Sequence, residues 1–255
     1  MGRSVDYSVI VPAYNEEQWL PKTLFYLNTA MRAIDRPGAL IVVDNNSSDR
    51  TAQVAQGYGA TVVFEPVNQI SRARNCGARA ARGEYLIFVD ADTTVSVRLL
   101  EEAIRLMSSG AACGGGTLVH PDAGANRWAR LGTRLWNTIS RQTGLAAGCF
   151  IFSRRDAFDA AGGFSEKVYA SEELWLSRRL KMWGKVRGQP FTIITGDHVI
   201  TSARKTEWYS PLRLLLAVSL IVVFPWSVRF RSLCGFWYRR PEVRPGSESR
   251  SPGDS

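Results

Sequence analysis

The sequence has 255 residues, 45% of them hydrophobic, so it is long enough for one large α/β domain with a buried core. Its net charge of +9 suits anionic partners, namely nucleotide phosphates, nucleic acid or an acidic membrane surface, without choosing among them. Its four cysteines include no CxxC pair and no zinc-ligand spacing, which argues against a zinc site and favours free thiols in a reducing cytosol.

The first ninety residues alternate between strand and helix patterns. Four runs are almost continuously apolar and predict buried strands at Tyr7–Pro12, Leu40–Asp44, Ala60–Glu65 and Glu84–Asp90. Apolar residues at helical spacing, or capping residues, predict helices over 16–31, from about Asp49, and over 72–82. This alternation predicts an α/β fold with a mostly parallel, Rossmann-like sheet flanked by helices. In such sheets, ligands bind in the crevice at the carboxyl ends of the strands.

Beyond residue 97 the pattern is less regular. We expect a helix over 97–109, a strand with close backbone approach at Gly114–Gly116, and an amphipathic helix over 126–142. A strand, a helix and a glycine turn follow over 149–164, and a further helix runs from about Ser171 to Gly184. We expect residues 1–205 to form one domain. Because the first residues contain no apolar run of signal-peptide length, we expect it in the cytoplasm, peripheral on the inner face of the cell membrane.

The C-terminal region has a different composition. The run Leu214–Trp226 is apolar except for Ser219 and Pro225, but a helix of that length rises only about 20 Å, short of the ~30 Å hydrocarbon core. We expect residues 206–238 to be a membrane-associating segment that lies in the interface with its arginines on lipid headgroups. A full span and a core or oligomer helix are the alternatives. Residues 239–255 are charged and rich in Pro, Ser and Gly, which predicts a disordered tail.

Two carboxylates stand one residue apart where the fourth strand ends. Asp90 and Asp92 repel one another and are poor core residues. In an extended strand, residues i and i+2 point to the same side, which would present two oxygen donors to one spot. Hard cations such as Mg²⁺ and Mn²⁺ prefer oxygen ligands and share coordination with substrate phosphates, so the pair predicts a divalent-metal and nucleotide site. The alternative is a solvated turn that caps the following helix.

Other strands also end in polar residues at this edge. Pro12 is expected to stop the first strand and to direct the next loop across the crevice. In that loop Tyr14 offers a flat face and Glu16 an acceptor, which would suit a base and ribose hydroxyls. Asp44 offers an acceptor for a base N–H or a hydroxyl. The alternative is a capping role for Asn15 and Asp44, and the two roles are compatible.

Four sequence blocks occur in the order YSVIVPAYNEE, IVVDNNSSDRT, RARNCGARAARGEYLIFVDADT and GGFSEKVYASEELWLSRRL. In this order they resemble the successive motifs of the family 2 glycosyltransferases, over roughly residues 7–204. The resemblance implies the GT-A fold and a nucleotide-sugar donor. It also implies sugar transfer with inversion at the anomeric carbon in a single displacement, with Mn²⁺ or Mg²⁺ as cofactor.

The resemblance assigns donor contacts to Pro12, Tyr14, Glu16, Asp44, Arg74, Asp90, Ala91 and Asp92. Asp44 would meet the base, and Arg74 the diphosphate, which arginine binds bidentately. Asp90 would meet the ribose and the metal, and Asp92 the metal. Arg74 is preferred over Arg72 for the diphosphate, and a solvated basic helix face is the alternative for both. Gly114–Gly116 would let the donor sugar lie close to the backbone.

For the acceptor side, the resemblance implies that Glu173 is the general base that takes the proton of the acceptor hydroxyl, with Glu172 beside it. The helix dipole alone also favours two carboxylates at a helix start. His198 is implied as a further metal ligand, and a packed or surface histidine is the alternative. Arg204 and Lys205 would hold the pyrophosphate or face lipid phosphates.

These observations predict an inverting, metal-dependent glycosyltransferase of cell-envelope polysaccharide or glycolipid synthesis, with a carbohydrate or lipid-linked acceptor and a membrane surface as partners. A polyprenyl-phosphate glycosyl synthase shares the blocks, and the apolar run 214–226 favours it somewhat. A non-catalytic membrane-held protein on a transferase scaffold is disfavoured by the set Asp90, Asp92 and Glu173. No GxGxxG follows the first strand, which disfavours a dehydrogenase, and we expect no nucleic-acid partner because charge alone suggests one.

Overall fold

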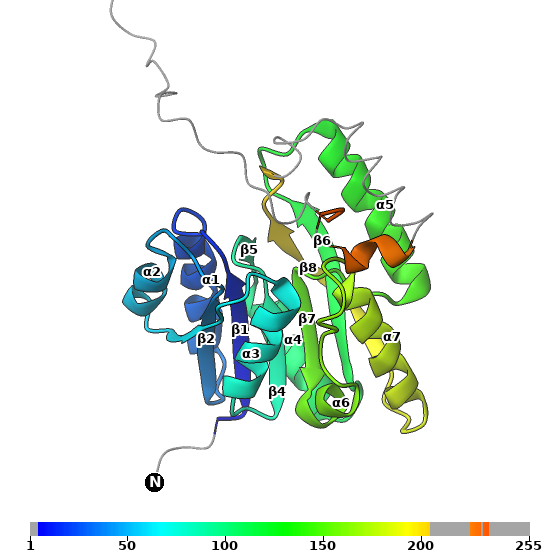
Figure 1. The fold of residues 1–255 in the computed structure, drawn as a ribbon. Coiled ribbons are helices and arrows are strands. Elements are labelled where there is room, and N and C mark those ends of the chain that lie inside the picture. The colour runs from blue at the N-terminus through cyan, green and yellow to red at the C-terminus, as the bar shows by residue number, and fades with distance from the viewer. Residues whose placement is uncertain (1–4, 205–224, 231, 235–255) are drawn as a thin grey trace, which may run out of the picture.

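The computed structural model describes residues 5–204, 225–230 and 232–234. They form one eight-stranded sheet with helices on both faces (Figure 1), in the strand order β3-β2-β1-β4-β7-β6-β8-β5. The strands are β1 Tyr7–Ala13, β2 Gly38–Asp44, β3 Thr61–Phe64, β4 Tyr85–Val89, β5 Thr93–Thr94, β6 Gly114–Pro121, β7 Phe150–Arg154 and β8 Phe191–Thr201. The α-helices are α1 Leu20–Ala33, α2 Thr51–Gly57, α3 Ile70–Ala80, α4 Val97–Ser108, α5 Arg127–Thr143, α6 Arg155–Ala160 and α7 Glu172–Lys185.

The prediction of an α/β fold with a mostly parallel sheet is confirmed. Strands β3, β2, β1 and β4 are all parallel, and Tyr7 lies opposite Gly38 on β2 and Tyr85 on β4. Strand β7 runs antiparallel to both of its neighbours, β4 and β6. Strands β6 and β8 are again parallel, with an irregularity at Thr117/Leu118. The parallel half therefore brings the carboxyl ends of β1, β2 and β4 to one edge of the sheet.

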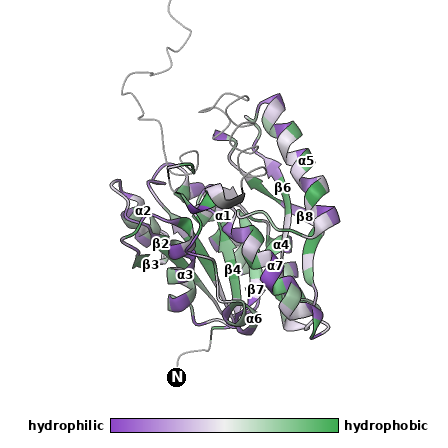
Figure 2. Ribbon diagram, turned by 45° about the vertical axis from the view of Figure 1, so that its right-hand side comes forward, coloured by the Kyte–Doolittle hydropathy of each residue, from purple (hydrophilic) through white to green (hydrophobic). Residues whose placement is uncertain are grey.

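Alternate residues of the central strands supply two separate core layers. Val9 and Val11 of β1 pack with leucines of α1 and α4 on one face. Ile10 packs on the other face, with residues of α3, α6 and α7. This is why the strands look continuously apolar in the sequence: each face of the sheet is covered by helices. Figure 2 shows the same layering, with green strands inside and purple on the outer parts of the helices.

Two predicted boundaries near the first loop are wrong. Pro12 does not stop β1, which continues to Ala13 with Pro12 opposite Val43. The pairing of β1 with β4 ends at Ile10, so β1 is paired on one side only where Pro12 lies, and it tolerates a residue without an N–H. Helix α1 begins at Leu20 rather than near Glu16, because Pro21 stands in its first turn, where a missing N–H costs least.

Most of the predicted membrane-associating segment lies outside the described residues, as does the predicted tail 239–255. Its described part includes a 3₁₀ helix, η1 Pro225–Arg229. Val228 and Cys234 pack against Val168 and Ala170, and Tyr169 N donates to Val228 O at 2.6 Å. This short segment therefore touches the loop that precedes α7. Among the residues described, no helix is long and apolar enough to cross a membrane.

Candidate active site

The two aspartates lie in a tight turn after β4. The strand ends at Val89, Asp90 N donates to Cys149 O at 3.2 Å, and Thr93 N donates to Asp90 O at 3.1 Å. The expected extended geometry is therefore not present, because the chain turns at these residues, although both carboxylates lie close enough to act on Cys149. The two side chains are instead held by different arginines.

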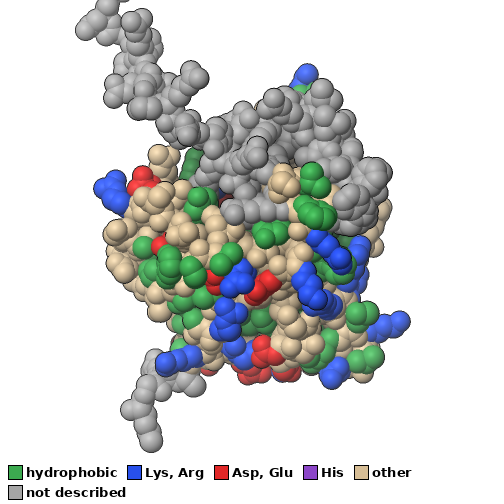
Figure 3. Space-filling model, viewed as in Figure 1, with side chains coloured by type: hydrophobic (Ala, Val, Ile, Leu, Met, Phe, Trp, Pro, Cys, Tyr) green, Lys and Arg blue, Asp and Glu red, His purple; other side chains and the backbone are tan. Residues whose placement is uncertain are grey.

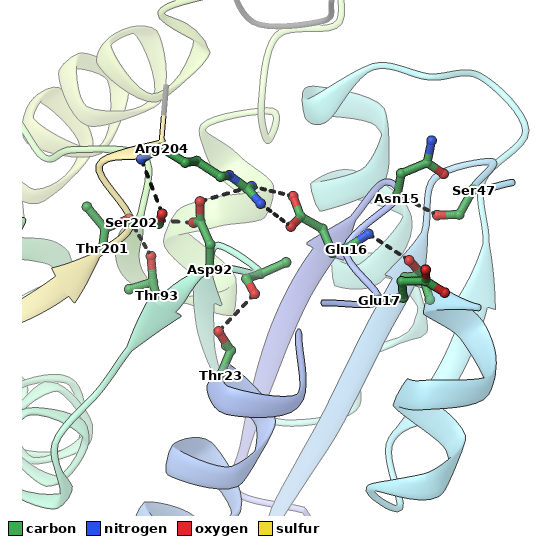
Figure 4. A network of polar contacts seen from close by, with 12 residues as sticks. Asn15, Glu16, Glu17, Thr23, Ser47, Asp92, Thr93, Thr201, Ser202 and Arg204 are labelled. Carbon is green, nitrogen blue, oxygen red and sulfur yellow. Dashed lines mark hydrogen bonds and ion pairs between the residues drawn. The ribbon is translucent and has the colours of Figure 1, made fainter. Parts of the chain in front are cut away.

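Neighbouring elements hold the backbone of this turn on two sides (Figure 4). From α1, Thr23 Oγ1 donates to Ala91 O at 2.8 Å. After β8, Ser202 N donates to Asp92 O at 3.2 Å. These contacts join segments far apart in the sequence, so the orientation of Asp92 depends on the whole sheet being assembled. No local motif signals Thr23 or Ser202 as site residues.

Arg204 binds two carboxylates at once. Its two terminal nitrogens contact Glu16 Oε1 and Oε2 at 2.6 and 2.7 Å, and Nη2 also lies 3.0 Å from Asp92 Oδ2 (Figure 4). The guanidinium lies over the Trp19 ring, with its Cζ 5.3 Å from the ring centroid. Burial by itself would lower the pKa of Arg204, but the hydrogen bond to Glu16 and the charge of Asp92 raise it. Arg204 thus ties the loop after β1 to the Asp90–Thr93 turn.

Arg74 makes the equivalent bridge on the other aspartate. Its side chain is 2% exposed, and it contacts Glu172 Oε1 at 2.6 Å and Asp90 Oδ1 at 2.8 Å. It also donates to Gly148 O at 2.8 Å and lies 5.1 Å from the centre of the Phe164 ring. Burial opposes its charge, but Asp90 and Glu172 more than offset this and raise the pKa of Arg74. Arg74 is thus a buried bridge between carboxylates rather than part of a solvated helix face.

The two glutamates at the start of α7 have different surroundings. Glu172 is buried and paired with Arg74, whereas Glu173 is half-buried and forms no ion pair with any described residue. Burial, then the charge of Glu172, raises the pKa of Glu173 to about 8. A carboxylate of that pKa is a suitable proton acceptor near neutral pH. The two neighbouring glutamates therefore differ in that Glu172 forms a buried ion pair with Arg74, whereas Glu173 has a raised pKa and no ion pair with a described residue.

The loop after β1 is fixed to the start of α2. Asn15 adopts a positive φ of 52°, its N–H donates to Ser47 Oγ at 3.0 Å, and its Oδ1 accepts from Ser48 N at 2.8 Å. Glu16 N donates to Thr51 Oγ1 at 2.8 Å. These bonds turn the Glu16 carboxylate toward Arg204 and away from solvent. Asn15 is thus a loop brace, and it does not cap α1, which begins five residues later.

The other predicted donor contacts lie at the same strand ends. Asp44 ends β2, opposite Ala13 of β1, and its Oδ1 accepts from Ser47 N at 3.0 Å. Tyr14 follows directly after β1. Asp44 therefore closes the turn after β2 with one carboxylate oxygen, and it does not cap α2, which begins at Thr51. Pro12, Tyr14, Glu16 and Asp44 converge on the edge where the Asp90–Thr93 turn lies.

The glycine turn before α7 is held by α3. Gly163 has a positive φ of 65°, and Asn75 of α3 binds both the N–H and the carbonyl of Phe164, each at 2.9 Å. Gln69 donates to Glu166 O and Val168 O at 2.9 and 3.0 Å. These amides place the loop that carries Glu172 and Glu173. Neither residue is marked by a sequence motif, because Gln69 directly precedes α3 and Asn75 lies in its arginine-rich stretch.

Protein atoms fill the space over Gly114–Gly116. A Cβ at Gly115 would overlap the Thr192 carbonyl, and one at Gly116 would overlap the Ala146 side chain. The absence of side chains here is therefore explained by packing against β7, β8 and the segment before β7. Close approach of a sugar is not needed to account for these glycines.

His198 lies on β8 beside the other histidine of the chain. Its ring stacks on His120 at 3.9 Å between centroids, and its Nδ1 lies 3.9 Å from Asp197 Oδ1. In the part of the chain that the structure describes, no three His, Cys, Asp or Glu side chains are grouped to hold a metal ion. His198 is therefore not gathered with Asp90 and Asp92 into a three-residue set.

The aspartate pair still has the chemistry for a divalent cation. Mg²⁺ is usually bound by one or two protein carboxylates, with substrate phosphates and water completing its coordination. Asp90 and Asp92 supply such oxygens at a strand end, and burial together with the charges of both aspartates raises the pKa of the neighbouring Cys149 thiol. That thiol is therefore protonated when no metal ion is bound. Each aspartate also contacts an arginine, so a cation would share or displace those contacts.

Comparison with known proteins identifies the family. Residues 8–162, more than half of the chain, match the model of glycosyl transferase family 2. The chain belongs to this family. The resemblance stated from the four sequence blocks is thereby confirmed, and this family 2 chain places the blocks at the carboxyl ends of β1, β2 and β4 and at the start of α7.

Curated relatives of this family 2 chain carry transferase names. It is 36% identical over 104 residues to an uncharacterized glycosyltransferase of Mycobacterium tuberculosis, a match covering 41% of this chain and 44% of the relative. It is 30% identical over 164 residues to the undecaprenyl-phosphate 4-deoxy-4-formamido-L-arabinose transferase of Pseudomonas paraeruginosa, covering 58% of this chain and 46% of the relative. The matches thus span less than half the length of either relative.

Solved structures of similar fold include a mannosyltransferase and a second protein solved with a nucleotide sugar. The mannosyltransferase PcManGT from Pyrobaculum calidifontis, in complex with GDP-Man and Mn²⁺, has a TM-score of 0.60 at 16% identity and covers 91% of this chain and 74% of that one. TarS of S. aureus, in complex with UDP-GlcNAc, has a TM-score of 0.58 at 19% identity and covers 85% and 67%. At these identities the likeness concerns the fold, which is GT-A-like as expected.

Proposed function

We propose that this family 2 chain is an inverting glycosyltransferase that moves a sugar from a nucleotide-diphosphate sugar to an acceptor hydroxyl in cell-envelope polysaccharide or glycolipid synthesis. One observation carries the proposal: Asp90, in the turn after β4, and Glu173, at the start of α7, both lie close to the buried Arg74. In the proposal this cluster serves both the diphosphate of the donor and the proton of the acceptor. An inverting transfer requires both groups.

The donor would bind along the carboxyl ends of β1, β2 and β4. Pro12, Tyr14 and Asp44 would contact the base, and Glu16 and Asp90 the ribose. Ala91 lies between the two aspartates, and its carbonyl accepts a hydrogen bond from Thr23 Oγ1. A ligand bound to this turn would lie close to its backbone. Arg74 would act on the diphosphate through Asp90 rather than by free bidentate contact, because its terminal nitrogens are already bonded. Arg204, which lies at the same edge of the sheet, would bind the phosphates once its contact with Asp92 is broken.

In the proposal Asp90 and Asp92 would hold Mn²⁺ or Mg²⁺, and His198 would be a further ligand. When bound, the cation would offset negative charge on the leaving diphosphate. The solved fold relative that contains GDP-Man and Mn²⁺ supports this choice of cofactor. The chain's own part is to hold two carboxylates in one turn, which needs the arginine contacts that balance their mutual repulsion.

In the proposed reaction Glu173 accepts the proton of the acceptor hydroxyl. The acceptor oxygen forms a bond to the anomeric carbon as the bond from that carbon to the diphosphate oxygen breaks, so the nucleoside diphosphate leaves with the bonding pair. Single displacement inverts the anomeric centre. Glu172 keeps its contact with Arg74 throughout and fixes the start of α7.

A polyprenyl-phosphate glycosyl synthase is the second candidate. The relative named for undecaprenyl-phosphate transfer favours it, and its acceptor oxygen would belong to a lipid phosphate. In this proposal a membrane-associating segment, 206–238, follows the catalytic domain 1–205 and precedes the tail 239–255. This segment would place such an acceptor near the site, at the inner face of the membrane. A phosphate acceptor is already ionised, so transfer to it would depend less on Glu173.

Figure 3 shows lysine and arginine side chains at several separate places on one face, with acidic side chains between some of them. Nucleic-acid binders gather basic residues on one face or along one helix. The coloured residues of this face form no continuous basic surface, which agrees with a small anionic ligand. The exposed arginines of α5 form a separate row, whose partner is considered below.

The test is transfer from a panel of UDP- and GDP-sugars by the full chain with Mn²⁺, to free oligosaccharides and to undecaprenyl phosphate in detergent. Product mass identifies the acceptor, and NMR of the anomeric proton reports inversion. Asp92→Asn is expected to abolish transfer, and Asp159→Asn, an exposed aspartate on α6, is the matched control. Failure of every donor to bind or react would overturn the proposal. Wild-type rates in Asp92→Asn would overturn the metal assignment alone.

A further inference from the structure

Helix α5 turns its large apolar side chains away from the protein. Trp128, Leu131, Leu135 and Ile139 are 49%, 56%, 62% and 37% exposed. Their spacing of three, four and four residues places them in one stripe along the helix. An amphipathic helix of a globular protein normally buries such a stripe against the core. This stripe therefore contributes little to the stability of the fold.

Small and polar residues hold the opposite side of α5 to the body. Ala129 packs with Ala125 and Ala203, and Asn137 bonds both the N–H and the carbonyl of Val119, at 3.0 and 2.9 Å. The helix thus has a structural attachment that does not use its apolar stripe. In Figure 2, green and purple turns alternate along α5, as expected for a helix with separate apolar and charged sides.

A row of arginines lies beside the apolar stripe. Arg127, Arg130, Arg134 and Arg141 are all exposed, and α5 contains no Asp or Glu. At 100° per residue they share one side of the helix, next to the stripe and opposite Trp136. Arg130 also donates to Ala125 O and Ala123 O at 3.0 and 3.1 Å, and Arg127 lies 5.1 Å from the Trp128 ring. The row is therefore partly anchored and points in a defined direction.

A partner for this face must be apolar and anionic at once. A second copy of the chain, packed through a twofold axis, would bring its own arginine row toward this one, and like charges disfavour that arrangement. An interfacial helix in a bilayer buries an apolar face among acyl chains and places arginines on the phosphates of anionic lipids. The residues of α5 match that pattern on both counts.

We propose that the outer face of α5 docks on the surface of an anionic membrane. This surface is distinct from the segment 206–238 and consists of described residues only. Ala129 packs on Ala203, next to Arg204, from the side of α5 opposite the apolar stripe, so docking would leave the thickness of this helix, about 10 Å, between the membrane and Ala203. The inference stands whether or not the chain transfers sugar, because it depends on the helix surface alone.

Vesicle co-sedimentation of the full chain tests the apolar stripe. The probes are vesicles of equal parts phosphatidylcholine and phosphatidylglycerol, and vesicles of phosphatidylcholine alone. The double variant Leu131→Asp/Leu135→Asp is expected to lower the partition coefficient onto the mixed vesicles at least about tenfold. The matched control is Phe25→Asp/Phe64→Asp, which places two aspartates at apolar positions 59% and 58% exposed elsewhere, and it is expected to bind like wild type.

A second pair of variants tests the charges. Arg134→Gln/Arg141→Gln is expected to weaken binding to the mixed vesicles and to reduce its salt dependence, whereas Arg79→Gln/Arg82→Gln, exposed at the end of α3 and just beyond it, is not. Circular dichroism and thermal melting verify that every variant is folded. Because segment 206–238 is present throughout, differences report on α5. Equal binding by all folded variants would overturn the proposal, and so would a change of oligomeric state in the Leu131/Leu135 variant with vesicle binding intact.

Discussion

Two buried arginines decide how the acidic side chains of the site are held. Arg74 bridges Asp90 and Glu172, and Arg204 bridges Asp92 and Glu16. Removing one partner from a buried ion pair leaves an uncompensated charge, which costs much more than the pair contributes. The aspartate pair that the sequence presents as a metal site is therefore also a structural charge network.

The first prediction concerns Arg204. Arg204→Gln is expected to lower the free energy of unfolding by about 3–5 kcal/mol, because it removes the buried guanidinium that contacts both Glu16 and Asp92. Urea unfolding followed by circular dichroism measures this. Arg50→Gln, which breaks the exposed ion pair with Glu17, is the control and is expected to change stability by less than about 1 kcal/mol. Equal effects of the two substitutions would contradict the structural role of Arg204.

The second prediction separates the glutamates of α7. Glu173→Gln is expected to lower the transfer rate about 10²–10⁴-fold without lowering the melting temperature, because it removes a proton acceptor that has no ion-pair partner among the described residues and whose ionised form burial disfavours. Glu172→Gln is expected to lower the melting temperature clearly, because Arg74 loses a buried partner. Rate and thermal melting are measured on the same samples. The reverse pattern would exchange the two assignments.

The third prediction concerns pH. Burial and Glu172 raise the pKa of Glu173 to about 8 from an ordinary value of 4.5, so a base at this position becomes active only as the pH rises toward 8. The folded state then binds a proton that the unfolded state has lost, so the stability from this group falls as the pH rises between 4.5 and about 8. Rate and stability should change in opposite directions over this range. Both trends should be absent in Glu173→Gln. A wild-type rate that is independent of pH between about 6 and 8 would contradict a proton acceptor of this pKa.

At the scale of single elements, helix glycines show how much context adds to propensity. Gly77 of α3 and Gly132 of α5 both stand inside helices, where glycine is the weaker choice by propensity. A Cβ at Gly77 would overlap Ile10 Cγ2, whereas a Cβ at Gly132 would meet nothing within 4 Å. The same residue type is therefore required by packing in one helix and optional in the other.

The fourth prediction follows from that contrast. Gly132→Ala is expected to stabilise the protein by about 0.5–1 kcal/mol through reduced backbone entropy of the unfolded chain. Gly77→Ala is expected to destabilise it by about 1–3 kcal/mol, because the added methyl group enters a filled core between β1 and α3. Chemical unfolding of both variants measures the pair. Changes of the same sign would show that the α3–β1 contact yields more easily than its packing indicates.

The elements themselves were largely predictable from the sequence. The apolar runs gave β1, β2, β3 and β4 within a few residues, and the periodic segments gave α4, α5 and α7. Errors occurred at Pro12 and at the start of α1, where pairing on one side of a strand and a proline in the first helical turn outweigh simple boundary rules. Local patterns identify an element more reliably than they identify its ends, because its neighbours decide the ends.

At the scale of the whole molecule, the sheet brings together residues nearly two hundred positions apart. Glu16 and Arg204 stand at opposite ends of the described domain and form the two-point contact that closes the edge of the sheet. Asp92 depends on Ser202 after β8, and Glu172 on Arg74 of α3. The site therefore exists only when the parallel half and the β6–β8 half are assembled together.

The fifth prediction uses this dependence. A donor that binds only the folded state should raise the melting temperature. At a free concentration a hundred times its dissociation constant, it adds about 2.7 kcal/mol to the free energy of unfolding. We expect such a shift with one class of UDP- or GDP-sugar in the presence of Mn²⁺, measured by scanning fluorimetry. The shift should be lost in Asp92→Asn and kept in Asp159→Asn, which lies on α6 away from the turn. A shift unaffected by Asp92→Asn would place the donor elsewhere.

The sequence by itself determined the fold class, the family and the set of candidate acids. Apolar runs, turn residues and four ordered motifs are local features, so they can be recognised along the chain without knowing how it folds. The tertiary structure alone decided how those acids are arranged. Glu172 forms an ion pair with Arg74, Glu173 forms none with a described residue, and Asp90 and Asp92 have separate arginine partners in one turn. It also decided that the apolar side of α5 faces outward. These outcomes depend on which groups share a low-dielectric space or lie open to solvent, and only the assembled chain defines that.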